Sequence, residues 1–408
     1  MPLPAQWIAA LTADHQVNIY STDQLVASVT AKRNARIAQF APGPGPAMKP
    51  LIKVARFDPR RTATFKLIDL LLAIGEITTP PVPNFADISS TWAVLRYVWA
   101  FDIPRIGRVG RLKLSDTARE LDRHQKTLLS DQMGIGMAKY VMSRFFSVHK
   151  ALDVSVALLD VNRWAAIQTF ARSPDYFFFN NPAGNLFVVE CKGNQSSRNQ
   201  TYHQLQSGSE QLPSIVFTNG RQVTSLVIGS CLLPNRTNVY VLDPPLGKDE
   251  QPEDSEKAHR EGKKTWRIQA PERFQADIQR IHAAKLLAYS GDYPQALKLA
   301  PGDVPERRAA LASEPRRLST RQNDFGTFEG TTERVVTTDG VRVRIFRGIS
   351  LPIKRALIEN AEEFYDDTSI ERLTGEHGYA NYSVETGRRM TVGSVSESGA
   401  VLEVSISG

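Results

Sequence analysis

Three ionisable residues near the middle of the chain have types and a spacing suited to chemistry: Asp175, Glu190 and Lys192. Asp175 precedes the apolar run Tyr-Phe-Phe-Phe, and Glu190-Cys-Lys192 follows Leu-Phe-Val-Val. The segment Asn-Asn-Pro-Ala-Gly-Asn between these runs is rich in turn-forming residues, which predicts a hairpin that brings Asp175 near Glu190. Because side chains alternate along a strand, Glu190 and Lys192 are expected on one face.

Two carboxylates and an amine at the strand ends of a buried sheet favour a bound divalent cation. Ionised groups lose hydration on burial, so they need a partner of opposite charge. Mg²⁺ takes carboxylate oxygens and keeps several waters, one of which can become a nucleophile. Lys192 would then orient or deprotonate that water.

The motif Pro174-Asp175, fourteen residues, then Glu190-Cys191-Lys192 resembles the PD-(D/E)xK nucleases, the restriction-endonuclease-like superfamily, over about residues 130 to 245. The resemblance implies that Asp175 and Glu190 hold Mg²⁺ or Mn²⁺ with the backbone carbonyl of Cys191. It also implies that Lys192 assists the attacking water. The local alternative is that Glu190 and Lys192 form an ion pair and that Asp175 starts a turn.

Helices on either side of the motif carry further candidates. Residues 202–212 are predicted to be helical, and many members of the superfamily place a polar residue there, which makes Gln204 a candidate or else a surface glutamine. Gly208 stands where some branches have Tyr. The helix predicted over 130–146 lacks the glutamate that members often carry. Asp131, expected near its first turn, is the only candidate, and the alternative is that it is a helix-start acid favoured by the helix dipole.

A second Glu-x-Lys occurs at Glu261-Gly-Lys263 within residues 248–264. That segment is dense in charge and has no apolar strand around it. It is therefore predicted to be a solvated loop rather than a second site.

Composition indicates an ordinary globular protein of two or three domains, with 408 residues, 41% hydrophobic and 23% charged. No apolar run approaches the about 20 residues that span a bilayer, and no leader segment is evident, which predicts a cytoplasmic protein without membrane contact. Cys191 and Cys231 are the only cysteines, and both lie in apolar segments. A disulfide framework and a zinc site are therefore disfavoured.

The basic excess is confined to the N-terminal third, where residues 1–130 hold 17 Lys and Arg against 10 Asp and Glu, while the remainder holds 33 of each. A localised basic region attracts phosphate, so DNA is the expected partner, although a solvated face is the alternative. Residues 105–114 are predicted to form a basic hairpin, as in a winged-helix module or a helical subdomain bracing the nuclease. The candidate nucleic-acid contacts are Arg105, Arg108, Arg111, Lys113 and Arg198, the last in the loop 193–201.

The predicted fold class is α/β, a restriction-endonuclease-like core in which helices flank a central mixed sheet. Strands are expected over 154–159, 225–233 and 238–242, and helices over 65–72, 89–99 and 271–299. The expected domains are a mainly helical N-terminal region (1–129), the nuclease core (130–300, with a charged insertion at 247–264), a linker (301–324) and an α+β C-terminal domain (325–408).

The C-terminal domain is predicted to consist of hairpins at 335–346 and 390–406 around a helix at 351–364. Arg342, Arg344 and Arg347 alternate along one strand, so two or three guanidinium groups are expected to share a face and contact phosphate. Acids at positions 362, 363, 366 and 367 are the alternative partners of that row. The domain is expected to serve interaction or oligomerisation.

Two functions of different class follow. The first is a Mg²⁺-dependent nuclease that hydrolyses DNA phosphodiesters, with restriction or anti-phage defence as the setting that the resemblance suggests; the sequence does not separate DNA from RNA. The second is a catalytically inactive nucleic-acid-binding or scaffold subunit. A homo-oligomer or a complex with a partner protein is expected, and energy from ATP would come from a partner because the chain has no Walker motif.

Overall fold

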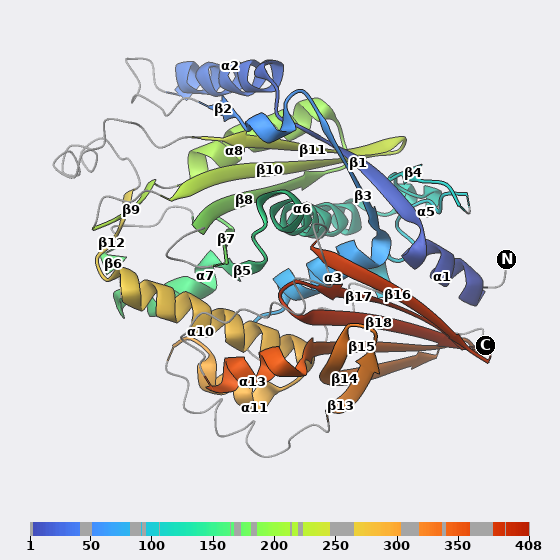
Figure 1. Ribbon diagram of the computed structural model, residues 1–408. Helices are drawn as coiled ribbons and strands as arrows, with labels where there is room; N and C mark the ends of the chain where they lie inside the picture. Colours follow the sequence, from blue (N-terminus) through green and yellow to red (C-terminus); the bar gives the residue numbers. More distant parts are fainter. Residues whose placement is uncertain are drawn as a thin grey trace.

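The chain forms two large sheets with helices between and around them (Figure 1). The computed structural model describes residues 3–40, 51–81, 91, 95–105, 107–163, 165–166, 173–180, 186–212, 214–218, 223–244, 265–302, 318–336, 340–359, 378–387 and 389–407. Within these ranges one sheet is mixed and has nine strands, and the other is antiparallel and has six. The mixed α/β class predicted from the sequence is confirmed.

The nine-stranded sheet has the order β3-β1-β11-β10-β8-β7-β5, with β2 on β11 and β4 on β1. β8 pairs in parallel with β10 and β1 with β11, while the other pairs along the main path are antiparallel. Its strands are β1 (Asp14–Tyr20), β2 (Ile52–Lys53), β3 (Arg61–Lys66), β4 (Gly110–Arg111), β5 (Lys150–Asp153), β7 (Tyr176–Phe179), β8 (Leu186–Asn194), β10 (Thr224–Leu233) and β11 (Arg236–Asp243).

Helices cover both faces of this sheet. Alternate residues of β10 separate the two sides: Ile228 belongs to the core cluster that includes α6 (Arg123–Phe146), while Val227 packs in the cluster of α2 (Asp23–Phe40) and α8 (Arg198–Gln211). Short helices α7 (Val154–Ala157) and η2 (Leu158–Arg163) follow β5, and β6 (Ala165–Ala166), β12 (Thr265–Ile268) and β9 (Ser214–Phe217) form a small third sheet. The sandwich arrangement positions β8 between α6 and α8.

The N-terminal region is part of the central sheet and not a separate helical unit. β1 pairs with β11 and β3 pairs with β1, so the boundary expected at residue 129 does not separate two sheets. The remaining elements of the region are α1 (Leu3–Thr12), η1 (Ala55–Phe57), α3 (Leu67–Thr78) and α5 (Asp116–Glu120). The expected apolar helix starts two residues later, because Phe65 lies in β3, and most of the helix expected over 89–99 lies outside the described residues.

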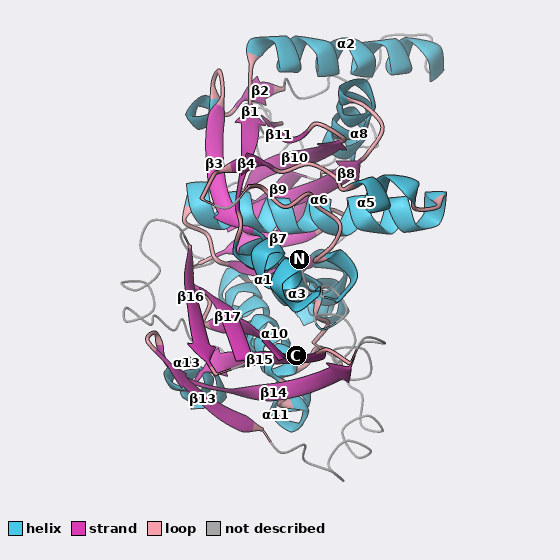
Figure 2. Cartoon of the chain, turned by 90° about the vertical axis from the view of Figure 1, so that its right-hand side faces the viewer, coloured by secondary structure: helices cyan, strands magenta, loops and turns pink. Residues whose placement is uncertain are grey.

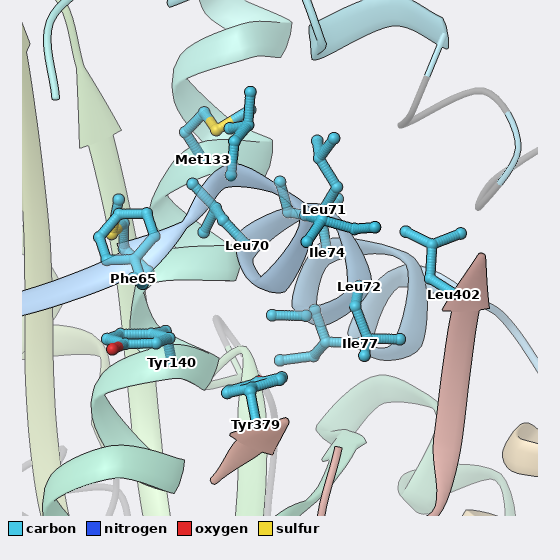
Figure 3. Close-up of a cluster of buried hydrophobic side chains, with 14 of the residues drawn as sticks. Phe65, Leu70, Leu71, Leu72, Ile74, Ile77, Met133, Tyr140, Tyr379 and Leu402 are labelled. Carbon is cyan, nitrogen blue, oxygen red and sulfur yellow. The ribbon is translucent and has the colours of Figure 1, made fainter. Parts of the chain in front are cut away.

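Helix α3 fills the space between the two large sheets (Figures 1 and 3). All residues from Leu67 to Ile77 are buried, and all of them except Asp69, Gly75 and Glu76 carry apolar side chains, as expected of a helix enclosed on every side. In the close-up, its side chains meet Met133 of α6 on one side and Leu402 of the second sheet on the other. The second sheet is therefore packed onto the core through α3.

The second sheet is curled and has the order β13-β14-β15-β18-β17-β16 (Figure 2). The predicted hairpins β14–β15 and β17–β18 are confirmed. The helical segment expected over 271–299 consists of two helices, α10 (Pro271–Ser290) and α11 (Tyr293–Leu299). The strands are β13 (Ser319–Asn323), β14 (Gly326–Val336), β15 (Arg342–Ser350), β16 (Tyr379–Thr386), β17 (Arg389–Ser396) and β18 (Ala400–Ser407), with α13 (Leu351–Glu359) after β15. β13 begins inside the expected linker.

Two further expectations are corrected. The segment 154–159 is helical rather than extended, because the side chain of Asp153 accepts hydrogen bonds from the backbone N–H of Ser155 and of Val156 and caps α7. Arg347 does not share the face of Arg342 and Arg344, since it lies an odd number of positions away and is fully buried. The acids expected near these arginines, residues 362–367, and the segment 248–264 with its second Glu-x-Lys lie outside the described residues.

Among the described helices, none combines the length and the apolar character needed to cross a membrane.

Candidate active site

The predicted hairpin between the two apolar runs is present. β7 and β8 pair antiparallel with Tyr176 opposite Val189, which places Asp175 beside the end of β8. Asp175 Oδ2 accepts a hydrogen bond of 2.7 Å from the backbone N–H of Cys191. The side chain of Asp175 therefore meets the peptide between Glu190 and Lys192. The turn expected over 180–185 lies mostly outside the described residues.

Glu190 and Lys192 lie on the α8 face of β8, as the alternation of side chains predicted. Their side chains form an ion pair in which Lys192 Nζ donates to Glu190 Oε1. Glu190 is 1% exposed, and Lys192 has a 22% exposed side chain. Gly208 of α8 explains this close packing, because a Cβ there would lie 3.0 Å from Glu190 Cγ. A tyrosine at this position would displace the helix.

Helix α6 crosses β8 at the motif through two glycines. A Cβ on Gly193 would lie 1.9 Å from the carbonyl oxygen of Ser130, and a Cβ on Gly134 would lie 2.8 Å from that of Lys192. Such distances require glycine at both positions. The contact brings Asp131, one residue after Ser130, to the motif.

A pocket of about 410 Å³ opens at this edge of the sheet. Asp131 of α6, Asp153 at the end of β5, and Asp175 and Lys192 of the hairpin all line it, together with Gln204 of α8. Further lining residues are Ile135, Ser155, Ser173, Pro174, Tyr176, Cys191 and Gly193. Three carboxylates and one ammonium group therefore converge on a cavity large enough for a phosphate group and its waters.

Burial makes this site unfavourable for negative charge. Burial, and then the neighbouring Asp175, raise the pKa of Glu190 to about 7, although Lys192 opposes that shift. Burial also raises the pKa of Asp175 and the pKa of Asp131, with Lys192 opposing in both cases. Burial lowers the pKa of Lys192, but the attraction of Glu190 and Asp175 outweighs it, so the net pKa lies above the usual value. The cluster holds more acid than its one lysine neutralises.

The acids fit a hard divalent cation. Glu190 Oε2 is buried and makes no hydrogen bond within the described residues, so one carboxylate oxygen is available as a ligand. Mg²⁺ is bound by one or two carboxylates and retains several waters, which suits a pair of acids with a backbone carbonyl. Within the described part of the chain, no group of three His, Cys, Asp or Glu side chains is close enough to form a ready metal site.

Gln204 is fixed by the strand end and does not project freely from the surface. Its Nε2 donates to the carbonyl oxygen of Gly193 at 3.2 Å, and its Oε1 accepts from Asn194 Nδ2 at 3.1 Å. Asn194 also donates to Thr201 Oγ1 at 2.7 Å and accepts from the backbone N–H of Ser196 at 3.0 Å. The amide pair therefore ties the start of α8 to the end of β8. The segment expected to be an exposed loop over 193–201 is partly buried and partly helical.

The basic candidates do not come together at this pocket. Arg105, Arg108 and Arg111 are exposed, and Lys113 pairs with Asp102 at 2.7 Å. The segment is closed by an antiparallel bridge between Phe101 and Leu114, and it adds β4 to β1, with Gly110 opposite His15. Arg198 is exposed at the first turn of α8, with its guanidinium 5.7 Å from the ring of Tyr202. None of the five basic residues is among the described residues that line the pocket.

The sequence pattern predicts Asp131 in a first helical turn and gives no role to Asp153. The structure starts α6 at Arg123, capped by Asp122, so Asp131 lies in the third turn, over the pocket. The sequence signal for Asp153 is an acid directly before a short apolar segment, but the β-branched residues of that segment predict a strand. No protein-family model, curated protein or solved structure gives a significant match to this chain.

Proposed function

We propose that this protein is a divalent-metal-dependent nuclease that hydrolyses DNA phosphodiester bonds, built on a restriction-endonuclease-like core. The single observation that supports the proposal best is that Asp175 and Lys192 line one pocket at the end of the β7–β8 hairpin, with Glu190 paired to Lys192. Mixed pairing in the central sheet, with α6 and α8 on opposite faces, is compatible with such a core.

Each residue has a role that its position supports. Asp175, Glu190 and the carbonyl of Cys191 would hold Mg²⁺ or Mn²⁺, which supplies a polarised phosphate oxygen and an activated water when bound. Lys192 Nζ would orient the water and stabilise the charge that develops on the phosphate. Gln204 would keep the Gly193 carbonyl, and with it the end of β8, in place. Asp131 and Asp153 would bind water in the pocket that they line.

A second candidate function is favoured by the ion pair itself. Lys192 and Glu190 already neutralise each other's charge in part, as an ion pair with a purely structural role would. In that case the protein would bind nucleic acid as an inactive subunit of a complex. The two functions differ in whether the pair must open for chemistry.

The discriminating experiment is a cleavage assay with the full chain. Supercoiled, linear and single-stranded DNA would be incubated with Mg²⁺, Mn²⁺ or EDTA, and so would RNA of the same sequence. We expect cleavage that requires metal, and a loss of at least about 100-fold in Asp175→Asn and in Lys192→Met. Asp243→Asn is the matched control, because burial also raises the pKa of Asp243 to about 6 and this residue lies outside the pocket lining.

Cleavage that persists in EDTA, or that is equal in Lys192→Met and the wild type, would refute the proposal. Binding of DNA without cleavage in either metal would favour the second candidate function.

A further inference from the structure

A cluster of arginines occupies one face of the six-stranded sheet. The strand register places Arg334 of β14 directly opposite Arg344 of β15. Arg342 lies two positions before Arg344 and therefore on the same face. Arg389 of β17 and Arg342 both pair with Ser407 of the strand between them. Four guanidinium groups from three strands thus share this face, which we call the arginine face.

Among the described residues, the acids of the sheet do not neutralise the arginine face. Arg334, Arg342 and Arg389 are exposed and Arg344 is half-buried, and none of them forms an ion pair with an acid of the described residues. Glu329 and Glu333 are an odd number of positions from Arg334 and lie on the opposite face, where Glu329 pairs with Lys354. Of the described acids, Glu403 is the one that the strand register places nearest to the arginine face.

Within the residues that the structure describes, the one acid on the arginine side is already engaged. Glu403 Oε2 accepts a hydrogen bond of 2.9 Å from Tyr382 Oη. The ring of Tyr382 covers Gly393, where a Cβ would lie 2.1 Å from the ring, and contacts Phe325 with 5.8 Å between ring centroids. A fifth arginine, Arg321, lies over the ring of Phe346 at 5.7 Å. The face therefore combines basic groups with aromatic rings.

This arrangement is unfavourable in the isolated protein. Like charges directly opposite in an antiparallel pair repel, as Arg334 and Arg344 do. The charges of Arg389, then burial, then Arg334, Arg321 and Arg342, lower the pKa of Arg344. Loss of the proton from a guanidinium is far from neutral pH, so the repulsion remains in the folded protein. A bound anion would relieve it.

The size of the arginine face favours a polymeric anion over a single phosphate. Arg334 and Arg389 lie on strands three intervals apart in the order β14-β15-β18-β17. Adjacent strands are about 4.8 Å apart, so the face spans roughly 14 Å. Duplex DNA presents a charge about every 1.7 Å along its axis, which can engage several such groups at once.

We propose that the arginine face binds the phosphate backbone of nucleic acid. The proposal rests on the nuclease function for the class of its ligand and adds a second contact for the same substrate. It is separable from catalysis because binding is measured in EDTA, where a metal-dependent site does not cleave.

The test uses the full chain and a fluorescent 30-base-pair duplex, with anisotropy recorded between about 50 and 200 mM NaCl. The variant replaces Arg334, Arg342, Arg344 and Arg389 by Ala. The control removes the same charge at four other exposed positions, Arg236→Ala, Arg273→Ala, Lys298→Ala and Arg355→Ala. A second variant replaces the four arginines of the face by Lys, which keeps the charge.

For the alanine variant, we expect the slope of log K, the DNA association constant, against log salt concentration to be smaller in magnitude by about 3 to 4. Its affinity for the duplex at low salt should be lower by roughly ten-fold or more. The control and the Lys variant should keep most of the slope. Thermal melting of each variant verifies folding, and the alanine variant should be at least as stable as the wild type because repulsion is removed.

Equal slopes in the wild type and the alanine variant would overturn the proposal, whether or not the protein cleaves DNA. Self-association that the alanine variant loses, with DNA binding unchanged, would assign the face to a second copy of the chain and also overturn it. Cleavage without Arg-dependent binding would leave the nuclease function intact, so the two failures are distinguishable.

Discussion

Gly134 of α6 lies directly over the peptide that follows Lys192, so that a Cβ at Gly134 would stand 2.8 Å from the Lys192 carbonyl oxygen. One turn earlier, Ser130 makes the same kind of approach to Gly193. The helix and the strand that carries Glu190 and Lys192 are therefore in backbone contact. The position of Asp131 relative to the motif depends on this contact.

Substitution of Gly193 should separate α6 from β8. In Gly193→Ala the new Cβ meets the Ser130 carbonyl at 1.9 Å, and backbone atoms cannot rotate away as a side chain can. We expect a loss of about 1 to 3 kcal/mol in the free energy of unfolding, measured by urea denaturation. Gly107→Asn serves as the control, because nothing lies within 4 Å of a Cβ there and Asn tolerates its positive φ. Equal stability of the two variants would contradict the contact.

Local patterns in the sequence were sufficient for the elements nearest the motif. The β7–β8 hairpin, the strands β10 and β11 and the helical segment 271–299 were predicted because each is an apolar run bounded by turn-forming or helix-ending residues. Asp175 and Glu190 come together through one such hairpin. Their proximity is therefore a local property of about twenty residues.

The predictions that were wrong concern contacts between residues far apart in the sequence and one helix that depends on a capping side chain. Pairing of β1 with β11 joins segments more than two hundred residues apart, as in Asn18 with Asn238, and no local pattern specifies such a partner. Residues 154–157 are rich in β-branched valine, yet the cap at Asp153 directs them into a helix. The predicted position of Asp131 within its helix was wrong because the helix starts at Arg123. Its distance from β8 depends on the contact of α6 with Gly193, which no local pattern specifies.

The stability of the protein should depend on pH through Glu190. Between its ordinary pKa of 4.5 and its folded pKa of about 7, the folded protein keeps a proton that the unfolded chain has released. The folded state then binds more protons, so stability falls as pH rises through this window and levels off above it. In EDTA, Glu190→Gln should be more stable than the wild type at pH 8, by up to about 3 kcal/mol, and nearly equal at pH 4.5.

Urea denaturation of both proteins at the two pH values measures this difference. A Glu190→Gln variant that is less stable than the wild type at pH 8 would mean that the pair with Lys192 outweighs the cost of burial.

Metal binding should reverse the pH dependence. A divalent ion needs ionised carboxylates, so the rise in melting temperature on adding about 10 mM Mg²⁺ should grow from pH 6 to pH 8. The rise should disappear in Asp175→Asn and in Glu190→Gln, and it should persist in the control Asp243→Asn. Differential scanning calorimetry in Mg²⁺ and in EDTA measures the effect without any DNA. A rise that survives both site substitutions would place the ion elsewhere.

The buried ion pair Lys139–Glu76 should couple the unfolding of the two sheets, so that they unfold together. Lys139 Nζ lies 3.0 Å from Glu76 Oε1, with side chains 1% and 4% exposed, and Glu76 Oε1 also accepts from Ser398 Oγ of the second sheet at 2.6 Å. Lys139→Met leaves a buried carboxylate without its cation, so we expect a loss of about 3 to 5 kcal/mol, partly recovered by adding Glu76→Gln. The exposed pair Lys113–Asp102 is the control.

Lys113→Met should cost less than about 1 kcal/mol, because that pair is 43% and 39% exposed and is screened by water. In the wild type a single unfolding transition is expected, since α3 packs against both sheets and Glu76 binds across them. Lys139→Met should weaken the interaction between α6 and α3, while the hydrogen bond from Ser398 to Glu76 remains. Two transitions in the wild type, seen by circular dichroism and tryptophan fluorescence at different urea concentrations, would show that the second sheet unfolds independently of the pair.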